Sequence, residues 1–131
     1  MIRIYAAALV TFLALDFAWL GVVAGAFYRT EMGSLMRERV LWLPALAFYA
    51  LFVVGIIVFV VIPAVERESV ARAVGMGAFF GLVTYATYDL TNLAVLRGFR
   101  AQLALVDMTW GTILCAAVSA VGYFVANRLS G

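Results

Sequence analysis

The chain contains no histidine and no lysine, and it has a single cysteine among its 131 residues. Without histidine it cannot build the His-ligated zinc, copper or haem sites found in many enzymes. Without lysine it cannot form a Schiff base with a substrate or cofactor. Cys115 has no second cysteine with which to form an intrachain disulfide or a cysteine-ligated cluster. These absences predict no bound metal, no cofactor and no catalytic side chain of the common nucleophile–histidine kind.

Charge is also scarce, because only 12% of the residues are charged while 67% are hydrophobic. An ordinary soluble domain has roughly 25% charged residues, and the mean hydropathy of this chain is +1.11. Nine basic and seven acidic residues cannot cover a soluble surface, so the composition predicts an integral membrane protein. The net charge of +2 is too small to indicate nucleic-acid binding. No glycine-rich phosphate-binding motif is present either.

Four apolar segments are each close to the roughly 20 residues that cross a bilayer as a helix. Backbone polar groups must be satisfied within each segment in lipid, so the segments are expected to be helices and not strands. The sequence therefore predicts an all-α integral membrane bundle of four transmembrane helices in one domain over residues 1–131. The expected spans are approximately residues 4–27, 41–62, 73–96 and 101–126.

The joints between these segments carry their own signals. Apolar residues recur at helical spacing within the charged stretch 28–39, which predicts a short interfacial helix between the first and second spans. Pro63 is expected to end the second helix and Ser69 to cap the third. The joint from Arg97 to Arg100 is so short that the third and fourth helices must be antiparallel neighbours. Four spans place both termini on one side, but the arginines are too evenly divided to orient the protein.

Three carboxylates lie inside the apolar segments, namely Asp16, Asp89 and Asp107. Each costs about 3 kcal/mol at the centre of a membrane helix, so each needs a partner or a purpose. At about 1.5 Å per residue, all three fall in the half of the membrane nearer Arg97 and Arg100. One reading is a polar site for protons, cations or another ligand. The other is structural, with the carboxylates hydrogen-bonded across helices.

Aromatic and polar side chains share helix faces with these carboxylates. Tyr85, Asp89 and Asn92 recur at helical spacing on one face, and Tyr88 flanks them. Aromatic rings beside carboxylates suit a cationic or polar ligand. The predicted ligand-binding or proton-handling set is Asp16, Trp19, Tyr85, Tyr88, Asp89, Asn92, Asp107 and Trp110. In contrast, the aromatic residues at helix ends, Tyr28 and Trp42, are expected to be interfacial anchors.

The sequence around these residues resembles a known family. The run from Tyr85 to Ala94, which contains Tyr-Asp-Leu-Thr-Asn, is similar to the signature of domain-of-unknown-function family 2177 (DUF2177), a family of small bacterial membrane proteins. The resemblance continues in the Asp-x-x-Trp motifs at Asp16 and Asp107 and spans essentially the whole chain. It implies four membrane helices and a location in the bacterial inner membrane, and it brings no established activity.

Three functional hypotheses follow. The first is a small membrane protein that binds or transports a small cationic or polar ligand, or protons, at the acidic and aromatic residues. The second is a non-catalytic accessory subunit of a larger membrane complex, docked through the uncharged second helix with Phe48, Phe52 and Phe59. The same phenylalanine face is equally consistent with contact to lipid. The third, ranked below both, is an intramembrane enzyme that uses paired aspartates. The Gly-x-Gly-Asp element of such enzymes is absent before Asp107, so the sequence favours a protein that is not an enzyme.

Membrane lipids are the expected partners of such a chain. Two glycine pairs at G-x-x-x-G spacing, Gly21 with Gly25 and Gly77 with Gly81, allow close helix approach. They serve either packing within the bundle or a homodimer, and the sequence does not separate the two.

Overall fold

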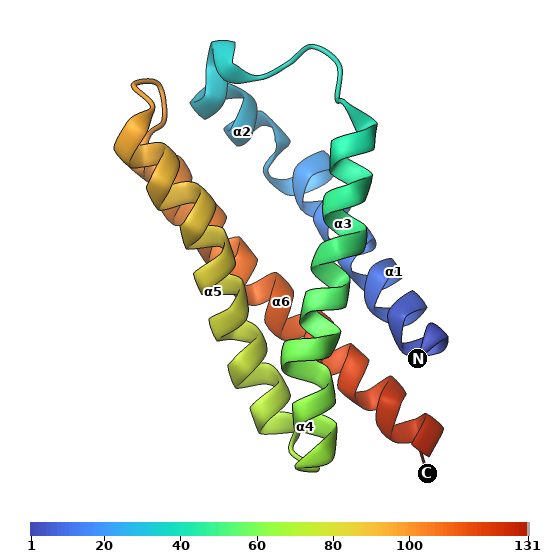
Figure 1. Ribbon diagram of the computed structural model, residues 1–131. Coiled ribbons are helices and arrows are strands. Elements are labelled where there is room, and N and C mark those ends of the chain that lie inside the picture. The colour runs from blue at the N-terminus through green and yellow to red at the C-terminus, as the bar shows by residue number, and fades with distance from the viewer. Residues whose placement is uncertain (131) are drawn as a thin grey trace.

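The computed structural model describes residues 1–130, and every element in this range is helical (Figure 1). Four helical runs are long and apolar enough to cross a membrane, which confirms the predicted all-α architecture with four spans. The first run is α1 (Ile2–Ala18) with the π-helical turn η1 (Trp19–Val23), and the second is α3 (Trp42–Ile56), the π-helical turn η3 (Ile57–Val61) and α4 (Ile62–Glu66). The third is α5 (Val70–Val95) and the fourth is α6 (Ala101–Ser130).

The second span continues past Pro63 and ends at Glu66, so the expectation that Pro63 terminates it is wrong. Proline has no N–H to donate, and its ring crowds the carbonyl four residues earlier, here that of Phe59. The helix widens into the π-helical turn η3 directly before Pro63, where the backbone N–H of Ile62 reaches the carbonyl of Ile57. This wider turn accommodates the proline, and the helix proceeds.

A short helix does lie between the first two spans, but it begins earlier than predicted. It is α2 (Gly25–Met32), followed by a 3-10 turn, η2 (Gly33–Leu35), and by non-helical residues up to residue 41. Gly33 has a φ of 52°, a conformation that favours glycine and ends α2. The apolar periodicity of residues 32–40 therefore does not correspond to a continuous helix.

The third and fourth spans form a tightly packed antiparallel hairpin, α5 with α6 (Figure 1). Ser69 caps α5 as predicted, because its Oγ accepts a hydrogen bond of 3.0 Å from the backbone N–H of Arg72. Gly77 and Gly81 lie against α6, so these two glycines allow α5 to pack closely on α6 within the chain. No heavy atom lies within 4 Å of a Cβ added at Gly21, so no other described helix of the chain packs closely against this glycine.

The first and second spans contact different parts of this hairpin. α1 packs along α6, while η3 and α4 contact both hairpin helices near the α4 end. From that end, α3 and α5 diverge toward the end that carries α2 (Figure 1). The two termini lie together at the end of the bundle away from α2, as four spans require (Figure 1).

Candidate functional site

A cavity of about 200 Å³ lies among α1, α2, α5 and α6. Seven of the eight residues predicted from the sequence line it: Asp16, Trp19, Tyr85, Tyr88, Asp89, Asp107 and Trp110. The eighth, Asn92, does not line it. The cavity also includes Leu20, Tyr28, Met32, Phe99 and Leu103.

Asp16 is buried and holds three helices together. Its Oδ2 accepts a hydrogen bond of 3.0 Å from the Tyr49 hydroxyl on α3. Its Oδ1 accepts one of 3.2 Å from the indole N–H of Trp110 on α6. Because each carboxylate oxygen has a donor from a different helix, the structural reading fits this residue best.

Asp107 receives its hydrogen bond through α2. The Tyr28 hydroxyl donates to Asp107 Oδ1 at 2.7 Å and accepts from the indole N–H of Trp19 at 3.1 Å. Burial raises the pKa of the Tyr28 hydroxyl above its ordinary value, so this group stays protonated and remains a donor. The expectation that Tyr28 is an interfacial anchor is therefore wrong: it is a buried bridge between α2 and α6.

The two Asp-x-x-Trp motifs interlock across α1 and α6. The Trp19 and Trp110 rings stack with centroids 4.5 Å apart and an angle of 5° between their planes. Trp110 donates to the aspartate of the other motif, Asp16, and Trp19 reaches Asp107 through Tyr28. The stack forms one wall of the cavity and positions both carboxylates relative to each other.

Asp89 differs from the other two carboxylates. It is 0% exposed, and neither of its oxygens accepts a hydrogen bond from an N–H or O–H group of the described residues. Asp107 lines the same small cavity as Asp89, so the two carboxyl groups share one space. Asp89 is thus a fully buried acid in the cavity wall whose oxygens have no hydrogen-bond donor among the described residues.

No basic side chain compensates this acidic pair. The cavity lining contains no arginine. Arg100 has a largely exposed side chain and pairs instead with Glu31 of α2, at 3.8 Å. Within residues 1–130, no group of three or more His, Cys, Asp or Glu side chains is placed to hold a metal ion. The site therefore has acidic character and suits a cation that one or two carboxylates can bind.

The path of the chain after α1 places Tyr28. In η1 the backbone N–H of Ala24 bonds to the carbonyl of Trp19, five residues earlier, at 2.7 Å. Ala24 then leaves helical geometry, and α2 begins at Gly25 with a new direction. A Cβ on Gly25 would collide with the Leu20 carbonyl, so this bend requires glycine. π-Helical turns recur at functional sites, and this one folds α2 over the cavity.

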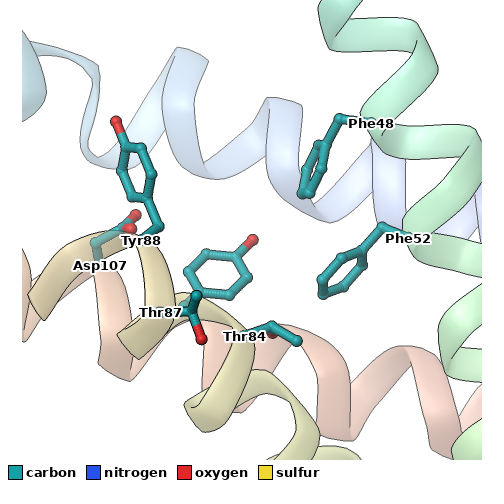
Figure 2. Close-up of a pocket in the computed structure, with 7 residues that line it drawn as sticks. Phe48, Phe52, Thr84, Thr87, Tyr88 and Asp107 are labelled. Carbon is teal, nitrogen blue, oxygen red and sulfur yellow. The ribbon is translucent and has the colours of Figure 1, made fainter. Parts of the chain in front are cut away.

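A second, larger cavity of about 500 Å³ adjoins the first, in the space between α3 and the hairpin. It is lined by Phe48 and Phe52 of α3, by Thr84, Tyr85, Thr87 and Tyr88 of α5, and by Asp107 of α6. In Figure 2, the two phenylalanine rings of α3 face Tyr88, Thr87 and Thr84 across this space, and Asp107 lies at the end near Tyr88. We call it the lateral cleft. It shares Tyr85, Tyr88 and Asp107 with the smaller cavity.

Sequence reasoning missed Tyr28 and Tyr49 as members of the site and treated Phe48 and Phe52 only as a lipid or docking face. One signal for Tyr49 was available, because a phenolic hydroxyl in an otherwise uncharged span needs a hydrogen-bond partner. Tyr28 gave no such signal, since its position near a helix end is equally typical of an interfacial anchor. Only the bend at Ala24 brings it inward.

The hydrogen bond between Tyr49 and Asp16 can be measured by a double-mutant cycle. We expect Tyr49→Phe to lower the free energy of unfolding in detergent, and Asp16→Asn to lower it further because two donors are affected. The coupling energy should be about 0.6–1.7 kcal/mol, the range for interhelical hydrogen bonds in membranes. Tyr5→Phe is the matched control, since its hydroxyl bonds only to the Ala50 carbonyl. A coupling near zero would contradict the direct hydrogen bond.

Fold and site together define a small multi-pass membrane protein with a buried acidic cavity between its helices. A family model, described as a predicted membrane protein family (DUF2177), matches residues 1–124. The chain belongs to this family, as the resemblance of its Tyr-Asp-Leu-Thr-Asn run indicated. No curated protein and no solved structure matches the chain.

Proposed function

We propose that the protein binds a small cation, of the class of protonated amines, at the paired carboxyl groups of Asp89 and Asp107. The observation that carries this proposal is Asp89, which is fully buried and has no N–H or O–H donor among the described residues. A buried acidic group without a donor is costly in a membrane unless something binds to it. The membrane is proposed to be the inner membrane of a bacterium.

The surroundings of the pair support an amine over other cations. An ammonium group supplies several N–H donors, which the free acceptor sites of the two carboxyl groups can receive. The faces of aromatic rings attract cations, and Tyr85, Tyr88, Trp19 and Trp110 surround the cavity. In the absence of the cation, a proton on the buried Asp89 carboxyl group, which has no donor among the described residues, would take its place. Binding would then exchange a proton for a cation, which is the proton-handling part of the proposal.

Thermal unfolding of the purified protein in a neutral detergent tests this proposal. We expect methylammonium chloride to raise the Tm saturably, because a ligand that binds only the folded state stabilises it. Sodium chloride at the same ionic strength should not. Asp89→Asn should remove the shift and leave the Tm without ligand near that of the wild type. Glu66→Gln, which removes an exposed carboxylate at the end of α4, is the matched control and should keep the shift.

Two results would contradict the proposal. One is a wild-type protein whose Tm responds equally to both salts. The other is an Asp89→Asn variant that is strongly destabilised without ligand yet keeps the methylammonium shift. Release of a proton on methylammonium binding, followed with an indicator dye in weak buffer, tests the exchange separately. If binding fails, the carboxylates are structural, and the accessory-subunit hypothesis becomes the leading one.

A further inference from the structure

We propose that the amine bound at Asp89 and Asp107 is the head of an amphiphile whose apolar tail lies in the lateral cleft and enters from the lipid. This inference rests on the proposed function and names the ligand class. The two cavities share part of their walls, because Tyr85, Tyr88 and Asp107 line both. A molecule with its charge at Asp107 therefore has the cleft directly beside it.

The sizes of the two cavities favour such a ligand. Binding sites for small molecules are typically about 300–1,000 Å³. The acidic cavity, at about 200 Å³, is below this range and holds only a head group. The lateral cleft, at about 500 Å³, is within it. Its far wall is formed by the rings of Phe48 and Phe52, which offer no charge and no hydrogen bond (Figure 2).

The depth of the cleft determines what can occupy it. Asp107 lies six residues after the start of α6, roughly 9 Å along the helix, and Phe52 lies ten residues after the start of α3, roughly 15 Å along. The cleft thus extends from the acidic pair toward the middle of a hydrocarbon core of about 30 Å. An occupant at this depth must be apolar except where it meets the carboxyl groups.

Charge complementarity then selects the kind of amphiphile. The acidic pair has no arginine beside it, so it favours a cationic head and repels an anionic one. An aminophospholipid carries a phosphate between its amine and its tails, and that phosphate would lie against the carboxyl groups. The structure therefore favours a hydrophobic amine without an intervening anionic group, such as an alkylamine.

The experiment compares three amphiphiles with the same ten-carbon chain: decylamine, 1-decanol and decanoate. The readout is the Tm of the purified protein in a neutral detergent, with methylammonium as a tail-less probe. We expect decylamine to raise the Tm, and 1-decanol and decanoate not to. Thr87→Phe fills the cleft from an exposed position whose hydroxyl bonds only to its own helix. It should lose the decylamine shift and keep the methylammonium shift.

Thr91→Phe is the matched control, an exposed threonine on the same helix outside the cleft lining, and it should keep both shifts. Thr84→Phe blocks the cleft at a second point and serves if Thr87→Phe does not fold. A decylamine shift that survives either blocking variant overturns the cleft as the tail site. Equal shifts from 1-decanol or decanoate, or from a short-chain phosphatidylethanolamine, overturn the amine selectivity. A wild-type protein that responds to neither methylammonium nor decylamine overturns the proposed function itself.

Discussion

Trp110→Ala should destabilise the protein by about 3 kcal/mol, the lower end of the range for tryptophan truncation in water-soluble cores. The lower end applies because lipid, and not water, solvates the side chain when the helices separate. The variant loses the stacking contact with Trp19 and the hydrogen bond to Asp16. Asp16 is buried, so the loss leaves one of its oxygens without a donor. Reversible unfolding in mixed micelles, followed by circular dichroism, measures the effect.

Trp42→Ala is the control for this variant, since Trp42 is 55% exposed at the start of α3. It should change the free energy of unfolding by less than about 0.5 kcal/mol. A stacked indole pair also gives an exciton-coupled circular dichroism signal. That signal should vanish in Trp19→Phe and in Trp110→Phe and persist in Trp42→Phe. Its presence in all three variants would mean that the rings do not stack.

Gly81→Ala should separate α5 from α6 and cost about 1–3 kcal/mol, as overpacking of a close contact does. A Cβ at residue 81 would collide with the carbonyl of Gly111, and it would come within 2.8 Å of Cys115 Cβ. The backbone carbonyl cannot move away as a flexible side chain can, so the helices must shift. Because Asp89 and Asp107 lie on these same two helices, we also expect the methylammonium shift in Tm to weaken.

Gly75→Ala on the same helix is the matched control, because no heavy atom lies within 4 Å of its added Cβ. Both variants gain the same helix propensity, about 1 kcal/mol in water-soluble helices, so the difference between them isolates the packing cost. Equal stability of the two variants would show that α5 and α6 do not approach closely at Gly81. The pair Gly77 and Gly81 would then be free for the homodimer that the sequence allows.

The amino-acid sequence by itself determined the fold class and the three carboxylates of the acidic cavity. Long apolar segments can cross a membrane in few ways, because hydrocarbon offers no partner for an unsatisfied backbone group. The same argument applies to side chains: Asp16, Asp89 and Asp107 cannot face lipid cheaply, so they turn toward the bundle interior. Helical spacing then placed Tyr85 beside Asp89. These inferences depend only on local chemistry, which a single sequence contains.

Only the tertiary structure decided which carboxylate is satisfied and which is not. Asp16 and Asp107 look equivalent in their Asp-x-x-Trp motifs, yet Asp16 has two donors and Asp107 has one, from Tyr28. The donors of Asp16 come from α3 and α6, whereas the donor of Asp107 comes from α2, which the bend at Ala24 brings over the cavity. The lateral cleft arises in the same way, from the divergence of α3 and α5 (Figure 1). Both features depend on how distant segments pack against each other, and helical periodicity describes only one helix at a time.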